Sequence, residues 1–156
     1  MADYRSASQN RSKALKAGDS LPMRSGKTPY SIKIVTASRK VIPNTGKPNK
    51  FAKLHKPQAE DKSDNAASLS FLLSFGKFRF LCCGDLTWNI EAKLMTPNNP
   101  IGKVDMFMVT HHGLPSSNNP VLVNAIAPRV AVMCNGPTKG GSASVLKTLR
   151  ECKSLQ

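Results

Sequence analysis

The order of apolar segments after residue 65 is the feature that most constrains the fold. Two β-rich runs, at residues 69–75 and 78–83, are separated only by Gly76 and Lys77, which is the spacing of a tight hairpin. Further apolar runs follow, with helical patterns at 88–95, 120–126 and 142–152 and strand-like patterns at 104–110 and 129–134. This β-β-α-β-α-β-α order predicts an α/β (α+β) layer rather than an all-β sandwich.

The N-terminal part is less regular. Residues 1–17 are polar and basic without a clear period, which predicts a flexible leader or a frayed helix. Residues 30–37 are β-rich and lead into a short second strand near 41–42. Residues 43–64 are rich in Pro, Gly, Asn and Lys, so we expect a long loop there, and we expect one domain over 18–156. His55 lies in that loop, and an exposed loop residue is favoured over a ligand.

The charge is high and uneven. The chain has 23 Lys and Arg against 9 Asp and Glu, a formal net charge of +14, and residues 1–62 hold most of the excess. A cationic surface of this kind binds polyanions, so a nucleic acid partner is one interpretation. The alternative is a solvated leader, because no aromatic side chains alternate with the lysines. A hydrophobic content of 40% argues against disorder of the whole chain.

Four cysteines are present without the spacing of a zinc site or the density of a disulfide scaffold. Cys82 and Cys83 are neighbours in an expected strand, so their side chains point to opposite faces and are interpreted as reduced core residues. The proximity of Cys83 to Asp85 leaves a minor ligand or redox role open. No segment reaches the ~20 apolar residues of a membrane span, so we expect a protein without a membrane partner, located in the cytoplasm.

Two short motifs stand where apolar runs end. Gly84 and Asp85 close the hairpin, and Thr110, His111, His112 and Gly113 close the run at 104–110. Reactive groups gather at the carboxyl ends of strands in α/β sheets, and carboxylates and imidazoles are ligands for zinc, iron or manganese. Asp85 alone has a structural alternative, a turn followed by an N-cap. The two motifs together favour a metal site.

At these residues the sequence resembles a known family. The residues that carry the resemblance are Gly76-Lys77-Phe78-Arg79-Phe80-Leu81, Gly84-Asp85-Leu86-Thr87-Trp88, Val109-Thr110-His111-His112-Gly113 and Asn135-Gly136-Pro137. They are similar to the C-terminal part of metallo-β-lactamase-fold hydrolases, in the branch that includes competence DNA-uptake proteins.

The resemblance implies half of an αββα sandwich, with a mixed sheet and helices on one face. It implies that Asp85 is a bridging metal ligand, that His111 is a second ligand, and that His112 is its neighbour. Zinc, as one or two ions, is the implied metal, with manganese or iron as alternatives. In that family a metal-bound hydroxide attacks an ester, lactam, thioester or phosphodiester.

The sequence departs from the family pattern in one respect. The principal metal-binding motif of the family, His-x-His-x-Asp-His, does not occur in this sequence. We therefore expect a truncated C-terminal half-domain with an incomplete site, which a homodimer or a complementary N-terminal half would complete. The leading hypothesis is a metal-dependent hydrolase that becomes active only when another chain completes its site. The alternatives are a basic nucleic-acid-binding or nuclease-like module and a catalytically inactive interaction fragment.

Overall fold

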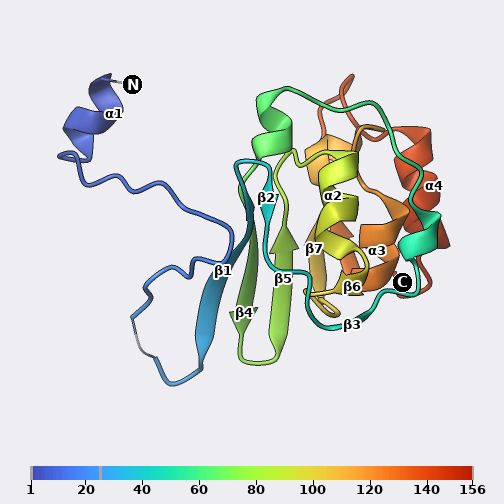
Figure 1. Cartoon of the computed structure of the whole chain (residues 1–156), viewed down its shortest axis with the longest axis horizontal. Coiled ribbons are helices and arrows are strands. Elements are labelled where there is room, and N and C mark those ends of the chain that lie inside the picture. Colours follow the sequence, from blue (N-terminus) through green and yellow to red (C-terminus); the bar gives the residue numbers. More distant parts are fainter. Residues whose placement is uncertain (1, 25, 156) are drawn as a thin grey trace.

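A mixed β-sheet flanked by helices forms the body of the molecule in the computed structural model, which describes residues 2–24 and 26–155 (Figure 1). Six strands lie in the order β2-β1-β4-β5-β7-β8, antiparallel from β2 to β5 and parallel from β5 to β8. These strands are β1 (Tyr30–Ala37), β2 (Lys40–Val41), β4 (Ser70–Phe75), β5 (Phe78–Cys82), β7 (Met106–Met108) and β8 (Val130–Val132). A separate pair joins β3 (Lys47–Pro48) to β6 (Asn98–Asn99). The helices are α1 (Ala2–Ala7), α2 (Trp88–Met95), α3 (Pro120–Ile126) and α4 (Ala143–Glu151), and 3-10 turns span Ala52–Leu54, Asp64–Ala67 and Thr110–Gly113.

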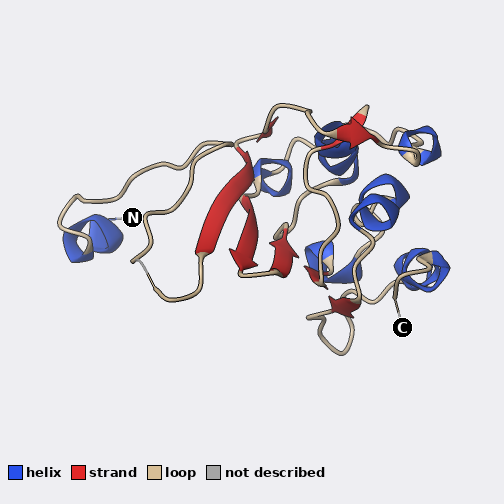
Figure 2. Ribbon diagram, turned by 90° about the horizontal axis from the view of Figure 1, so that it is seen from below, coloured by secondary structure: helices blue, strands red, loops and turns tan. Residues whose placement is uncertain are grey.

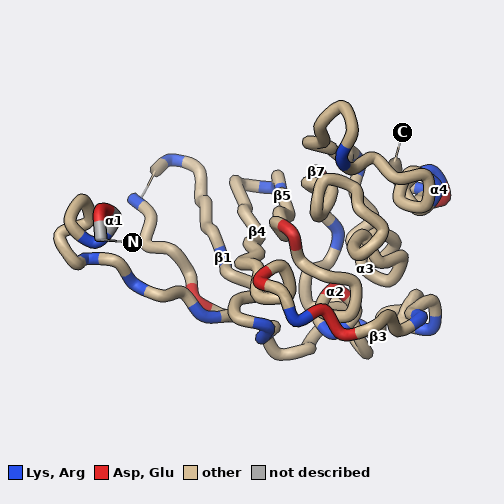
Figure 3. Tube along the Cα trace, turned by 90° about the horizontal axis from the view of Figure 1, so that it is seen from above, with Lys and Arg blue, Asp and Glu red and all other residues tan. Residues whose placement is uncertain are grey.

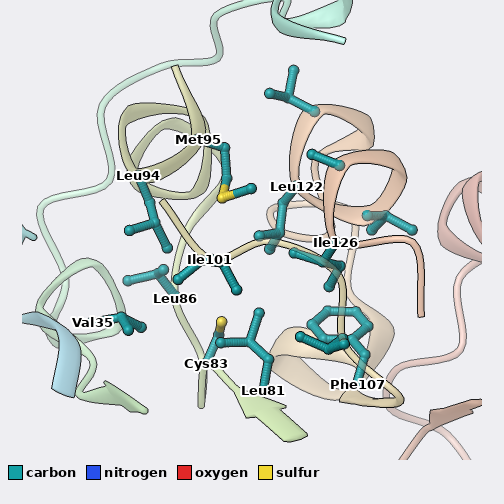
Figure 4. Close-up of a cluster of buried hydrophobic side chains, with 14 of the residues drawn as sticks. Val35, Leu81, Cys83, Leu86, Leu94, Met95, Ile101, Phe107, Leu122 and Ile126 are labelled. Atoms are coloured by element: carbon teal, nitrogen blue, oxygen red, sulfur yellow. The ribbon is translucent and has the colours of Figure 1, made fainter. Parts of the chain in front are cut away.

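One face of the sheet carries the core. Figure 2 shows helices α2, α3 and α4 along the same side of the strands. Leu81 of β5 is paired with Phe107 of β7, so the two side chains lie on the same face of the sheet. Both are fully buried beneath the helices. The side chains that fill the space include Leu86, Leu94, Met95, Leu122 and Ile126 (Figure 4). The predicted α/β layer, with a mixed sheet and helices on one face, is therefore confirmed.

The opposite face, here called the open face, has no helix packed on it among the described residues (Figure 2). The strand register aligns apolar side chains across five strands on this face. They include Ile32, Phe71, Leu73, Phe75, Phe78, Phe80, Cys82, Met106, Met108, Val130 and Val132. Phe75 is 53% exposed and Val130 is 52% exposed, and none of these side chains is charged. A contiguous apolar surface of this kind is typical of a face that binds another element.

The predicted elements agree closely in the C-terminal half. The helices expected at 88–95 and 120–126 have those bounds in α2 and α3. The strand expected at 104–110 is shorter, because β7 spans only Met106–Met108 and a tight turn with left-handed residues begins at Thr110. The expected leader contains α1, which lies away from the sheet at the end of an extended segment (Figure 1).

The segment 43–64 is mostly without regular secondary structure, apart from β3 and the 3-10 turn Ala52–Leu54. Two asparagines anchor it to the end of α2. Asn44 donates a 2.9 Å hydrogen bond to the Leu94 carbonyl, and Asn49 donates one of 2.8 Å to the Met95 carbonyl. Long-range side-chain bonds of this kind have no local sequence pattern. In the part of the chain that is described, no helix has the length and apolar character to cross a bilayer.

Two adjacent leucines of β4 test the difference between the faces. Leu72 is 8% exposed on the helix-covered face, whereas Leu73 lies on the open face. Replacement of Leu72 by alanine is expected to lower the free energy of unfolding by about 3 kcal/mol, because it leaves a cavity in the core. The same change at Leu73 is expected to cost about 1 kcal/mol or less. Urea denaturation of both variants measures this, and equal losses would show that the open face is covered in solution.

Candidate functional site

The parallel pairing of β5 with β7 brings the two motifs to one edge of the sheet. Cys82 at the end of β5 is in register with Met108 at the end of β7. The chain then continues from both strands in the same direction, and the backbone N–H of His111 donates a 2.9 Å hydrogen bond to the carbonyl of Gly84. Asp85 and the two histidines therefore lie together, as the sequence predicts from strand ends in an α/β sheet.

The histidines occupy an unusual backbone conformation. His111 has φ of 52°, His112 has φ of 57° and Gly113 has φ of 77°, so three consecutive residues are in the left-handed region. A residue other than glycine in this region costs of the order of 1 kcal/mol or more, and such strain gathers at functional sites. Asn118 stabilises the turn, because its side chain accepts from the Thr110 N–H and donates to the Thr110 carbonyl.

A second segment holds the same turn from outside. The N–H of Gly141 donates to the His112 carbonyl at 2.9 Å, and the Ser142 hydroxyl donates to the Gly113 carbonyl at 2.6 Å. A Cβ on Gly140 would overlap the His112 carbonyl oxygen, so this close approach requires glycine. Ser142 stands at the predicted N-cap of α4, but its hydroxyl holds the histidine turn instead of capping the helix.

Asp85 faces both imidazoles. Its Oδ1 lies 3.7 Å from Nε2 of His112, and its Oδ2 lies 3.9 Å from Nε2 of His111. Both separations are too long for direct hydrogen bonds. The Asp85 side chain is 38% exposed and that of His112 is 41% exposed, while His111 is largely buried. A small group from solvent can therefore reach the space between the carboxylate and the rings.

The hydrogen bonds of His112 define its neutral tautomer. Its Nδ1 lies 2.7 Å from the carbonyl of Cys134, which can only accept. The hydrogen of the neutral ring is therefore on Nδ1, and Nε2 presents a lone pair toward Asp85. Backbone carbonyls orient metal-binding imidazoles in this way.

The neighbours of His111 allow the same tautomer. The Ser117 hydroxyl donates to the Leu86 carbonyl at 2.7 Å, so its oxygen can accept from Nδ1 of His111 at 3.4 Å. Ser116 lies 3.2 Å from the same nitrogen. The side-chain amide of Asn65 lies 3.4 Å from Nε2 and acts there as a donor. With its hydrogen on Nδ1, the His111 ring would have an Nε2 lone pair that accepts from Asn65 on the side of Asp85.

Two nitrogen lone pairs opposite a carboxylate repel it unless a proton or a cation lies between them. Donor atoms around one tetrahedral zinc ion are about 3.4 Å apart, so the observed separations of 3.7 and 3.9 Å exceed that by a few tenths of an ångström. Within residues 2–24 and 26–155, no closed group of three or more His, Cys, Asp and Glu side chains surrounds a common point. Asp85, His111 and His112 thus lie near one another without forming a closed metal site in the described residues.

Asp85 lies in a turn after β5, as its structural alternative predicts, but Thr87 and not Asp85 occupies the N-cap of α2. His55 is half-buried rather than exposed, and its Nδ1 lies 3.0 Å from the Asn119 side chain. Sequence reasoning missed Asn65 and the two serines. It also missed Asp61, whose carboxyl accepts from Ser63. Hydrogen bonds from the side chain and backbone of Ser63 are the main cause of a lowered pKa of Asp61, and the charge of His111 lowers this pKa further.

A buried carboxyl supports the histidine turn from below. Glu91 of α2 is fully buried, and its Oε2 accepts a 2.7 Å hydrogen bond from the Asn119 N–H at the start of α3. Burial raises the pKa of Glu91 to about 7, opposed by hydrogen bonds from Asn119, Asn118 and Thr110. Burial, and then the Glu91 charge, raise the pKa of the Cys83 thiol well above its usual range. Cys83 is therefore a protonated core residue rather than a thiolate ligand.

Replacement of Glu91 by glutamine is expected to remove a pH dependence of stability. A carboxyl whose pKa is raised by folding stabilises the protein below its unfolded pKa, near 4.5, and loses that contribution as the pH rises toward 7. The wild-type protein should lose roughly 3 kcal/mol over this interval relative to the variant. Urea denaturation from pH 4.5 to 8 measures the difference, with Glu151→Gln as the exposed control. Parallel curves for the wild type and Glu91→Gln would contradict the assignment.

Comparison with known proteins adds one similarity. No protein-family profile matches the chain. A stretch of 96 residues, 60% of the chain, is 31% identical to Recombination protein 2 of Haemophilus influenzae. The stretch corresponds to 12% of the length of that protein, so the chain spans a small part of this relative. This stretch is therefore similar to a short part of a protein that is named for recombination.

Proposed function

We propose that this chain forms one part of a metal-dependent hydrolase site of the metallo-β-lactamase type. The observation that carries the proposal is that the Nε2 atoms of both histidines lie 3.7 and 3.9 Å from the two oxygens of Asp85. A divalent cation bound there would polarise a substrate oxygen and activate water. Zinc suits a set of imidazole and carboxylate donors, and manganese or iron are the alternatives.

The residues of this chain have defined roles in that proposal. Asp85 and the two histidines hold the cation. The Cys134 carbonyl and the Ser117 hydroxyl fix the ring orientations, so the lone pairs are aligned before the cation binds. The amide of Asn65 lies 3.4 Å from Nε2 of His111 and would turn from that nitrogen to a substrate oxygen when a cation binds. Such donors stabilise charge that develops on a substrate.

The site needs further ligands, and the open face indicates where they come from. The chain exposes 9835 Å². A compact monomer of its 16.9 kDa mass exposes about 7,700 Å². A stable interface buries about 800 Å² on each partner. We propose that a complementary half, which carries a second sheet and the missing histidines, packs on the open face.

A second copy of this chain is a poorer occupant of the open face. A second copy would add only another set of Asp85, His111 and His112, and none of the missing histidines. Two molecules of net charge +14 also repel each other. Sedimentation at low micromolar concentration is therefore expected to give a species near 16.9 kDa that binds an apolar dye. A stable dimer without dye binding would identify a second copy as the occupant.

Phosphodiesters are the favoured substrates among the esters, lactams and phosphodiesters that the fold type hydrolyses. The relative is named a recombination protein, and the charge of +14 attracts polyanions. The same charge supports a second candidate function, nucleic acid binding without catalysis. The two differ in their dependence on Asp85, because binding through lysines and arginines survives its loss.

Calorimetric titration with zinc tests the site. One ion per chain is expected to bind, and Asp85→Asn or His112→Ala is expected to weaken binding by about tenfold or more, because each removes a donor. The matched control is His55→Ala, which removes an imidazole outside the site and should leave the affinity unchanged. Equal zinc affinity in all variants would refute the site.

A further inference from the structure

A cluster of lysines lies at the end of the molecule opposite the histidines. Two adjoining cavities, of about 570 and 560 Å³, share the residues Lys50, Phe51, Lys103 and Ala125. Lys153 lines the first cavity and Lys47 lines the second. We call this region the lysine cleft. It lies near β3, β6 and the C-terminal end, whereas Asp85 and the histidines follow the opposite ends of β5 and β7 (Figure 1).

The backbone that carries these lysines is held firmly. Lys47 is paired with Asn99 between β3 and β6. The Asn99 side chain donates to the Ala125 carbonyl and accepts from the N–H groups of Ile101 and Gly102, which fixes the turn before Lys103. Asn49 is buried and anchors the segment just before Lys50. The cleft is therefore a feature of the fold, unlike the charges along the N-terminal segment.

The positive charges of the cleft have no acidic partner. Among the described residues, no ion pair includes Lys47, Lys50, Lys103 or Lys153. Glu151 at the border of the first cavity faces Lys147 at 3.8 Å on its own helix. Figure 3 shows Lys and Arg positions beside β3 and at α4. Ammonium groups that converge on a concave surface raise the local concentration of anions.

The floor of the cleft is apolar and partly aromatic. Ala125 and Cys152 are buried there, and the Phe51 ring packs against the core, with Nζ of Lys50 5.1 Å from its centroid. Lysines that follow a groove, together with an aromatic ring, are the combination that binds single-stranded nucleic acids. Each lysine can contact a phosphate as a point charge.

We propose that the lysine cleft binds the phosphate groups of a nucleic acid strand, as a site separate from Asp85 and the histidines. The two cavities continue into each other, so neighbouring phosphates of one strand can contact different lysines. This site does not require the metal site, because none of its residues contacts Asp85 or the histidines.

Fluorescence anisotropy with a short labelled oligothymidine tests the proposal on the full chain. The double variant Lys50→Gln, Lys103→Gln is expected to bind about tenfold or more weakly at low salt. Its plot of log affinity against log salt should be shallower by about 1.4, because two phosphate contacts are lost. The matched control is Lys40→Gln, Lys77→Gln, which removes the same charge from residues outside both cavities.

The outcomes separate the possible sources of phosphate and the two sites. In one outcome, inorganic pyrophosphate displaces the oligonucleotide at a concentration similar to that of the oligonucleotide. This result would show that the cleft binds phosphate but would assign it to a small ligand instead of a nucleic acid strand. Equal weakening in both double variants would overturn the proposal, because binding would then follow total charge. Asp85→Asn should retain oligonucleotide binding, so failure of the metal site leaves this test intact. Exposed lysines are replaced in both variants, and urea denaturation checks that both remain folded.

Discussion

The parallel pairing of β5 with β7 is the interaction on which the rest of the structure depends. It places Leu81 beside Phe107 in the core, and both side chains are fully buried beneath α2 and α3. The same register delivers Asp85 and His111 to one edge, where the His111 N–H bonds to the Gly84 carbonyl. The burial that stabilises the sheet thus also sets the position of the candidate site.

The site combines a strained turn with supports from several elements. Asn118, Gly141 and Ser142 hydrogen-bond to the backbone of the turn, and Glu91 holds the start of α3 below it. This network keeps consecutive histidines in left-handed conformations that they would rarely adopt alone. Strain maintained by surrounding structure is typical of sites that are preorganised for a ligand.

Local patterns were sufficient to predict much of the framework. The helices at 88–95 and 120–126 follow from their apolar periodicity and their flanking Asn and Pro residues, and the hairpin follows from Gly76 and Lys77. The predicted end of β7 was wrong, because the Asn118 side chain accepts from the Thr110 N–H and turns the chain there.

The chemistry of the candidate site was only partly accessible from the sequence. Asp85 and the histidine pair stand at strand ends, so their meeting was predictable. Their tautomers depend on the Cys134 carbonyl and Ser117, which come from other segments and carry no motif. The lysine cleft was likewise hidden, because its lysines are scattered along the chain and meet only after β3 pairs with β6.

The central claim is that His111 and His112 present unprotonated Nε2 atoms to one cation beside Asp85. Long-range ¹H–¹⁵N NMR of the imidazoles during zinc addition measures this directly. Hydrogen on Nδ1 of both rings is expected at neutral pH before zinc is added, with shifts of both Nε2 signals on addition and none for His55. Hydrogen on Nε2 of His112, or equal shifts at His55, would contradict the account.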